Sequence, residues 1–363
     1  MKINYDNIIY SLQRVGGISR YWTELIKRIS IKENLNFYEK KNNNLFRKEI
    51  NISTFNESII SSKILRFIPF YKKLPEKSIF HSSFYRTTYQ KNVVKIITVY
   101  DFIEEYYEKS FVSKINTWQK KNSLKNADGI ICISNSTKKD LFKFLPNIDK
   151  HKVKTIYISS ENKFFNLKYP MGNIKDNEFS TLHDKKIILF VGARKKSYKN
   201  FFLAVDIVSY LKEYTLISVG PNKITKYERK QIEEKLPEKF YHFTNLSSEK
   251  LNKLYNISFC LLYPSTYEGF GIPILEAMKA GCPVISTHAS SIPEVAGDAA
   301  ILVHGIKKEA FIEAIKSLND KKLRSKLINK GFLQAKKFSW DKCFEETIKF
   351  YSKIYKKKFK GCL

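Results

Sequence analysis

Residues 259–282 read FCLLYPSTYEGFGIPILEAMKAGC, and this stretch sets the expected fold class. The apolar run Phe259–Tyr263 predicts a buried strand, and the residues after Pro273 are good helix formers. The loop between them holds Gly269 and Gly271, and Pro273 suits the first turn of a helix. A strand that enters a helix through a glycine loop is typical of parallel α/β sheets, which bind ligands at this end of their strands.

The same alternation of strand and helix extends along the rest of the chain. Short β-branched runs predict strands at 79–81, 93–99, 129–133, 153–158, 186–191, 214–219, 259–263 and 283–286. Amphipathic stretches predict helices at 19–29, 137–144, 200–211 and 247–255, and after Glu309 the chain is almost wholly helical. This order predicts two doubly wound parallel sheets that face a cleft. The irregular segment Glu161–Asp184 is the expected linker, which divides the chain into domains 1–165 and 166–339.

Composition excludes several classes of protein. The chain has 363 residues, of which 43% are apolar, which is enough for packed cores and too many for a disordered chain. No apolar run reaches the ~20 residues of a membrane helix. The N-terminus MKINYDNIIYSLQR lacks the apolar block of a signal peptide. The five cysteines are scattered, which favours reduced thiols in a cytoplasmic protein over disulfides or zinc.

The formal charge of +30 requires a physical interpretation. Residues 1–172 carry 31 basic and 15 acidic residues, and residues 173–363 carry 34 and 20, so the excess is spread over both halves. Such a charge attracts polyanions: nucleic acid, an anionic membrane face, or an anionic substrate. A biased composition with lysine on every solvated face is the simpler alternative. No nucleic-acid-binding module accompanies the charge, which argues against nucleic acid as the partner.

The glycine loop of residues 264–282 is the strongest candidate site. A helix that begins after such a loop offers free N–H groups and a favourable dipole to a phosphate, here from Phe270, Gly271 and Ile272. Glu268 and Glu276 flank the loop. Two carboxylates beside an anion site make sense if they accept hydrogen bonds from hydroxyl groups of a ribose and a sugar. The alternative for Glu276 is that it only complements the helix dipole.

A second candidate site is FVGARKKSYKN, residues 190–200, where a strand ends at Gly192. Arg194 and Lys199 in this loop are suited to hold a diphosphate without a metal ion. Lys195 and Lys196 fit a basic surface turn better.

Two weaker candidates lie in the N-terminal half. Gly16 and Gly17 precede the first predicted helix and allow a ligand to approach the backbone closely. Asp101 follows the strand 93–99, where catalytic loop residues belong, although a turn or N-cap role is as good an interpretation. The six histidines show no metal spacing, and of these only His81, at a strand end, remains a candidate.

The run PSTYEGFGIPILEAMKAGCPVISTHASSIPEVAGDAAILV resembles the donor-binding segment of glycosyltransferase family 4, a family of retaining sugar transferases of the GT-B fold, with two Rossmann-like domains. The resemblance extends in order along nearly the whole chain. Further segments that match are Gly16–Tyr21, Thr98–Asp101, Ile133–Leu141, Gly192–Asn200, Ser291–Val295 and Phe338–Trp340. The two glutamates Glu268 and Glu276, with seven residues between them that include Gly-Phe-Gly, are the specific part of this match.

The resemblance implies a retaining hexosyltransferase that needs neither a metal nor another cofactor. Its expected catalytic residues are Glu268, Arg194, Lys199 and Asp101. The residues expected to bind the nucleotide-sugar donor are Gly16, Gly17, Gly192, Arg194, Lys199, Gly220, Thr244, Glu268, Gly269, Phe270, Gly271 and Glu276. Glu276 would accept from ribose hydroxyls and Glu268 from the donor sugar. The resemblance also implies that the C-terminal helix 340–363 packs back on the first domain.

The implied reaction moves a hexose, with a GDP-mannose-like donor preferred, to a glycan or lipid-linked glycan in surface polysaccharide synthesis. The Lys-rich surface suggests attachment to the anionic inner face of the membrane. One departure from the family is Tyr100, where the family often has His. That His would contact the donor sugar or act at the reacting carbon, so with Tyr100 this role becomes doubtful or passes to Asp101. Two alternatives stay open: an inactive sugar-nucleotide-binding partner of another transferase, and a polyanion- or nucleic-acid-binding protein.

Overall fold

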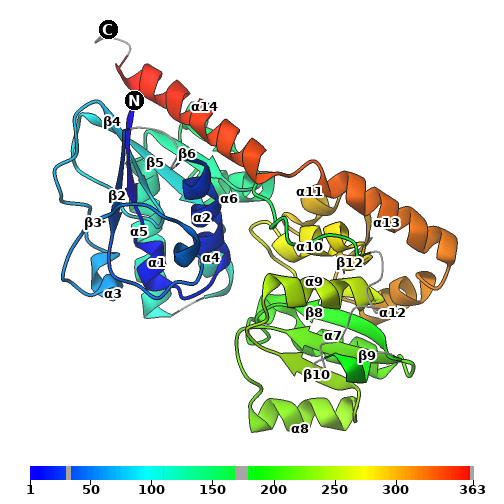
Figure 1. Ribbon diagram of the computed structural model, residues 1–363. Coiled ribbons are helices and arrows are strands. Elements are labelled where there is room, and N and C mark those ends of the chain that lie inside the picture. Colours follow the sequence, from blue (N-terminus) through cyan, green and yellow to red (C-terminus); the bar gives the residue numbers. More distant parts are fainter. Residues whose placement is uncertain (30–33, 109, 168–178, 183, 360–363) are drawn as a thin grey trace. The chain divides into compact units, whose positions relative to one another are not determined.

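The computed structural model describes residues 1–29, 34–108, 110–167, 179–182 and 184–359. It divides into two compact units, which we call the first unit (Met1–Ile158 with Ser339–Leu363) and the second unit (Ser159–Phe338). The boundary therefore lies seven residues before the predicted division at 165/166. Each unit is built around a parallel sheet with helices on both faces (Figure 1), which confirms the predicted fold class.

The first unit contains a seven-stranded sheet with the order β3-β2-β1-β4-β5-β6-β7, and all its pairings are parallel. The strands are β1 (Lys2–Asp6), β2 (Leu35–Glu39), β3 (Phe55–Asn56), β4 (Ser78–Ser82), β5 (Val93–Val99), β6 (Gly129–Cys132) and β7 (Val153–Thr155). The central strands are buried on both faces, as a parallel sheet requires.

The helices of the first unit are α1 (Ile9–Leu12), α2 (Gly17–Ile29), α3 (Ser62–Leu65), α4 (Ile103–Tyr107), α5 (Phe111–Lys125), α6 (Asn135–Phe144) and α14 (Trp340–Phe359), with 3₁₀ turns at Arg47–Glu49 and Lys150–Lys152. Helix α14 belongs to this unit although it ends the described chain (Figure 1). It packs on α2 and the sheet, and the ion pair Arg28–Asp341, with 2.7 Å between Nε and Oδ1, fastens its start.

The second unit contains a six-stranded parallel sheet with the order β10-β9-β8-β11-β12-β13. Its strands are β8 (Lys186–Val191), β9 (Tyr214–Val219), β10 (Phe240–Phe243), β11 (Cys260–Tyr263), β12 (Val284–Thr287) and β13 (Ala300–Val303). Its helices are α7 (Phe201–Ser209), α8 (Lys226–Lys235), α9 (Ser248–Ile257), α10 (Ile272–Ala280), α11 (Ile292–Ala296), α12 (Lys308–Ser317) and α13 (Lys321–Ala335), with 3₁₀ turns at Ser180–Leu182 and Ser197–Lys199. Buried aliphatic side chains of β8, β9, α7 and α12 form its core.

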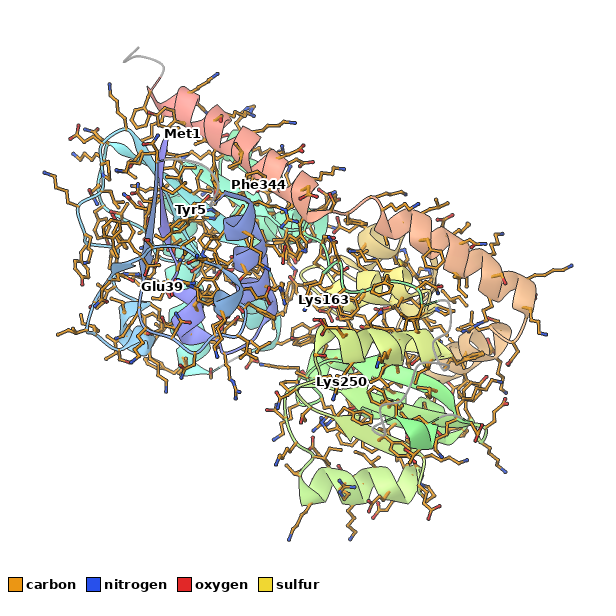
Figure 2. All side chains as sticks on the ribbon, viewed as in Figure 1. Met1, Tyr5, Glu39, Lys163, Lys250 and Phe344 are labelled. Atoms are coloured by element: carbon orange, nitrogen blue, oxygen red, sulfur yellow. The ribbon has the colours of Figure 1, made fainter. Side chains whose placement is uncertain are left out.

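The segment predicted as a linker is in part a packed piece of the second unit. The backbone N–H of Phe165 donates to Asn252 Oδ1 at 3.1 Å, and that of Leu167 donates to Asn256 Oδ1 at 2.7 Å, so both residues are tied to α9. Figure 2 labels Lys163, which pairs with Glu249 at 2.7 Å. The rest of that prediction, at 168–178 and 183, falls outside the described residues.

Candidate functional site

The glycine loop joins β11 to α10 as the sequence predicted. Gly271 adopts φ 98° and ψ 49°, a left-handed conformation that favours glycine, and α10 begins at the next residue with Pro273 in its first turn. In the first turn of α10, Pro273 has no N–H group and the N–H of Ile274 donates to the carbonyl oxygen of Gly271 at 3.0 Å, so Ile272 supplies the N–H group that these first residues can offer to an anion. The helix dipole adds positive potential there. The loop therefore has the backbone geometry of an anion-binding site.

Two serines after β12 brace this loop, and the sequence analysis assigned them no role. Ser290 Oγ accepts from the N–H of Glu268 at 2.7 Å and donates to its carbonyl oxygen at 2.9 Å. Ser291 Oγ donates to the carbonyl oxygens of Glu268, at 2.9 Å, and Phe270, at 3.0 Å. These bonds hold the backbone on both sides of Gly269. The residues that follow β12 therefore fix the backbone from which the Glu268 side chain extends.

Lys199 and Glu268 meet although they are 69 residues apart. Lys199 Nζ lies 2.5 Å from Glu268 Oε1 and 2.9 Å from the hydroxyl of Tyr263, at the end of β11. The two charged side chains are 13% and 10% exposed, so solvent still reaches both. Burial, and next the charge of Glu268, raise the pKa of Tyr263, which therefore stays protonated. Lys199, predicted from the sequence to hold the diphosphate, and Glu268, predicted to accept from the donor sugar, thus form one ion pair.

Arg194 is held by protein groups. Its Nη2 donates to the carbonyl oxygens of Asn222, at 3.0 Å, and Lys223, at 3.2 Å, and Nη2 lies 3.7 Å from Glu228 Oε2. Nη1 lies 2.8 Å from a ring nitrogen of His242. Burial lowers the pKa of Arg194, and the Glu228 carboxylate opposes this shift. The guanidinium ties the loop after β8 to the loop after β9 through Nη2, while its buried Nε has no hydrogen-bond partner among the described residues.

Gly192 and Gly220 directly follow β8 and β9 and lie against each other. A Cβ atom on Gly220 would fall 2.5 Å from the carbonyl oxygen of Gly192, which leaves no room for a side chain. The N–H of Gly220 donates to Phe243 O at 3.1 Å, and Thr244 follows directly at the end of β10, half-buried. These predicted donor-binding residues therefore lie, like Arg194, just after the carboxyl ends of strands in the second sheet.

Glu276 lies in α10 and is oriented by a partner from α9. The hydroxyl of Tyr255 donates to Glu276 Oε2 at 2.9 Å. Burial, and next the charge of Glu276, raise the pKa of Tyr255 well above its usual value, so this hydroxyl remains a donor. The carboxylate is therefore positioned by a tertiary contact in addition to any effect of the helix dipole.

The remaining predicted site residues belong to the first unit. Gly17 is the first residue of α2, and Ser19 Oγ donates to the carbonyl oxygen of Gly16 at 3.0 Å. Asp101 Oδ1 accepts from the N–H of Ile103 at 3.1 Å, so it acts as the turn residue that starts α4. Tyr100 is buried, and its hydroxyl donates to Ser83 O at 3.2 Å.

The retention of His81 as a candidate was wrong. The side chain is fully buried; its Nδ1 lies 2.5 Å from the Tyr351 hydroxyl and its Nε2 3.0 Å from Thr98 Oγ1. Burial lowers its pKa to about 3, so the ring is neutral. His81 is a satisfied core residue that helps fasten α14 to the sheet.

Sequence reasoning missed the groups that surround Arg194. Thr225 caps α8, and Glu228 completes the capping box with its carboxylate on the Thr225 N–H at 2.9 Å. The pattern T-x-x-E is a sequence signal that predicts this cap. No comparable signal marks His242, because its contacts with Arg194 and with Ser218, 2.7 Å from Nδ1, come only from the fold.

Two findings concern metals and membranes. Across residues 1–29, 34–108, 110–167, 179–182 and 184–359, no group of three or more His, Cys, Asp or Glu side chains is arranged to hold a metal ion. None of the helices in this described part is both long and apolar enough to cross a bilayer.

Comparison with known proteins finds a family match for part of the chain. Residues 173–334, which contain the site residues from Gly192 to Glu276, match the family described as glycosyl transferases group 1. Over this segment the chain is therefore similar to a glycosyltransferase family. It is 42% identical over 104 residues to the O-antigen chain mannosyltransferase B of Escherichia coli, which is 28% of this chain and 27% of that protein. It is 28% identical over 239 residues to the O-antigen chain mannosyltransferase RfbU of Salmonella typhimurium, which is 61% and 60% of the two chains. The aligned parts thus span less than two thirds of either relative.

Solved structures share the fold of this chain over 95% to 98% of its length. HepE of Anabaena, in complex with UDP and glucose, superposes with a TM-score of 0.72 at 14% identity and covers 97% of this chain and 99% of its own. A sucrose-phosphate synthase from Thermosynechococcus elongatus gives 0.75 at 17% identity, with 98% and 99% covered. WaaG, a glycosyltransferase involved in lipopolysaccharide biosynthesis, gives 0.66 at 13% identity, with 95% and 98% covered. All three support the GT-B fold.

Proposed function

We propose that this protein is a retaining, metal-independent hexosyltransferase that moves a sugar from a nucleotide-diphosphate sugar to a glycan acceptor. The observation that carries the proposal is the Lys199–Glu268 pair beside the N-terminus of α10, within the family-matched segment. Mannose is the favoured sugar, because the O-antigen relatives named above are mannosyltransferases. A lipid-linked glycan of a surface polysaccharide is the favoured acceptor.

The diphosphate of the donor would sit against the N-terminus of α10, with Lys199 as its cation. Lys199 is the better candidate than Arg194, because Arg194 is held by the carbonyls of Asn222 and Lys223. A phosphate that approaches Lys199 competes with Glu268 for the ammonium group. Glu268 is then released to accept a hydrogen bond from a sugar hydroxyl, so one exchange of partners places both ends of the donor.

The transfer step would depend on position and electrostatics. Lys199 and the N-terminus of α10 would stabilise the negative charge that develops on the leaving nucleotide diphosphate. Once released from Lys199, Glu268 is engaged by a hydroxyl group of the donor sugar, so we do not assign it the role of nucleophile. We therefore favour a front-face attack in which the acceptor hydroxyl bonds to the anomeric carbon, the bond to the diphosphate breaks, and a phosphate oxygen takes the proton. This course retains the configuration.

The test is a donor panel in the presence of EDTA. GDP, UDP and ADP sugars are compared by the thermal shift that each causes and by nucleotide release with a glycan acceptor, because a ligand of the folded state raises the melting temperature. We expect one donor class to bind and to turn over. Lys199→Gln should lower kcat/KM for that donor by about 10² to 10³.

Lys195→Gln is the matched control, because Lys195 is exposed in the same loop, and it should behave as the wild type. An unchanged kcat/KM in Lys199→Gln would refute the assignment of this residue. Absence of binding to every donor, together with tight binding to a random oligonucleotide, would replace the transferase by a polyanion-binding protein.

A further inference from the structure

The first unit contains a basic cavity that the proposed donor chemistry does not use. It has a volume of about 660 Å³ and lies at the carboxyl ends of the edge strand β3 and its neighbour β2. Glu39, the last residue of β2, lies in the wall of this cavity and is labelled in Figure 2. A second cavity of about 390 Å³ shares Lys41, Asn42 and Asn44 with the first and also touches Arg14. Small-molecule sites have volumes of roughly 300–1,000 Å³, so the larger cavity can hold a phosphate with attached groups.

The cavity carries uncompensated positive charge. Glu39 is the acidic residue in its wall, and Arg47 Nε contacts both of its oxygens, at 2.7 and 2.8 Å, while Asn42 Nδ2 donates at 2.9 Å. In the part of the chain that the structure describes, no carboxylate pairs with Lys41 or Lys48, and both side chains are exposed. Since Arg47 neutralises Glu39, these lysines leave an excess of positive charge that attracts an anion.

Lys40 connects the cavity to an apolar rim. Its ammonium donates to the carbonyl oxygens of Ile59, at 3.0 Å, and of Ile60, and these bonds leave its charge unpaired. Ile59 is 95% exposed and lies in the cavity wall. We use the term apolar rim for the exposed large apolar side chains of residues 55–71, which are Phe55, Ile59, Ile60, Ile64, Phe67 and Tyr71. In the described part of the second unit, such side chains are spread from residue 165 to residue 333.

We propose that this cavity binds the phosphate group of an amphiphile, whose apolar chain lies on the rim that begins at Ile59. Lys41 and Lys48 would hold the phosphate, and burial of the rim would supply the preference for a chain. A free phosphate would leave the rim exposed, and a flat lipid surface would leave the cavity empty. Binding of an amphiphile in this cavity goes beyond the proposed sugar transfer. The two are linked only because a lipid-linked acceptor is a phosphorylated amphiphile.

The test measures binding by calorimetry at low salt with three probes: inorganic phosphate, octyl phosphate below its micelle concentration, and octyl glucoside. We expect octyl phosphate to bind more tightly than either of the others. The double substitution Lys41→Gln/Lys48→Gln should weaken octyl phosphate by about tenfold or more, given about 1 kcal/mol per lysine. Ile59→Asn should weaken octyl phosphate and leave inorganic phosphate unchanged.

Matched controls come from exposed positions of the second unit. Lys321→Gln/Lys322→Gln removes the same charge, and Leu333→Asn, at a side chain that is 63% exposed, removes a similar apolar group. Both should bind octyl phosphate as the wild type does, and thermal melts check that every variant is folded. Equal loss in the control pair, or no loss in Lys41→Gln/Lys48→Gln, overturns the proposal.

A vesicle arm separates a phosphorylated amphiphile from a membrane surface. Sedimentation is measured with phosphatidylcholine vesicles with and without phosphatidic acid. If the protein sediments with the acidic vesicles through Lys41 and Lys48 but does not bind octyl phosphate in solution, the region is a membrane dock and the cavity assignment is wrong. None of these readouts uses a sugar donor, so their failure is distinct from failure of the proposed transfer.

Discussion

Two clusters of charge, one in each unit, lie at the carboxyl ends of parallel strands and differ in their access to water. In the first unit, Arg86 Nη1 lies 3.1 Å from Asp6 Oδ2 and 2.6 Å from Glu57 Oε1, and none of these side chains is more than 1% exposed. In the second unit, Lys199 and Glu268 are 13% and 10% exposed.

The difference separates a structural role from a binding role. Charges without access to water cannot exchange partners with a ligand, and removal of one leaves the others unpaired at a large cost. A pair that solvent can reach can open when an anion arrives. We therefore attribute to the Arg86 cluster a role in the stability of the first unit, and the access of solvent to the Lys199 pair supports the donor-binding role proposed for it.

The largest effect that this contrast predicts is on stability. Arg86→Met should lower the free energy of unfolding by about 3–5 kcal/mol, because it leaves the carboxylates of Asp6 and Glu57 buried without a counter-charge. Denaturant titration followed by circular dichroism measures the change.

Arg229→Met serves as the control for that titration, because this side chain is 61% exposed and pairs with Glu233 at 3.4 Å. It should cost less than about 0.5 kcal/mol. Lys199→Gln should lose less stability than Arg86→Met. A loss in Lys199→Gln as large as that in Arg86→Met would remove the contrast between the two clusters.

A smaller effect is expected where the second unit positions Glu276. Tyr255→Phe removes one hydrogen bond to the carboxylate, which is worth about 1 kcal/mol, and should raise the KM for the donor about fivefold with little change in kcat. The measurement is steady-state nucleotide release at several donor concentrations.

Tyr227→Phe is the matched control, since Tyr227 is 72% exposed on α8, and its KM should equal that of the wild type. A change in melting temperature without a change in KM would make Tyr255 a purely structural residue.

The smallest predicted effect is the pH dependence of the first cluster. Burial, and next the charge of Asp6, raise the pKa of Glu57 to about 7, while Arg86 opposes the shift. The folded state therefore binds more protons than the unfolded state between about pH 4.3 and 7. The free energy of unfolding should fall as pH rises through this window.

Glu57→Gln should reduce that fall by about 1 kcal/mol, as measured by urea unfolding at about pH 5 and about pH 8. Asp6, whose pKa burial also raises, keeps part of the dependence. An unchanged slope in Glu57→Gln would show that this carboxyl group does not titrate in the window.

Much of the fold was predictable because local patterns of apolar and polar residues in the sequence indicate it. The strands 93–99, 186–191 and 214–219 were predicted with the bounds that the structure has, since each is a buried run of β-branched and apolar residues. Strands β1, β2, β3, β10 and β13 were missed. Polar or aromatic residues interrupt the pattern of the first four, whereas β13 is an apolar run of only four residues. Helix α10 was predicted from its glycine loop and its proline.

The sequence by itself determined the fold class and the identity of Lys199, Glu268 and Glu276 as site candidates, since residue type and spacing around glycine loops carry that information. Only the tertiary structure decided their partners. Glu268 meets Lys199, Arg194 is held by the loop after β9, and His81 is enclosed by α14, which lies 270 residues further along the chain. These contacts join strand ends that are distant in sequence, and no local periodicity records which of them become neighbours in a parallel sheet.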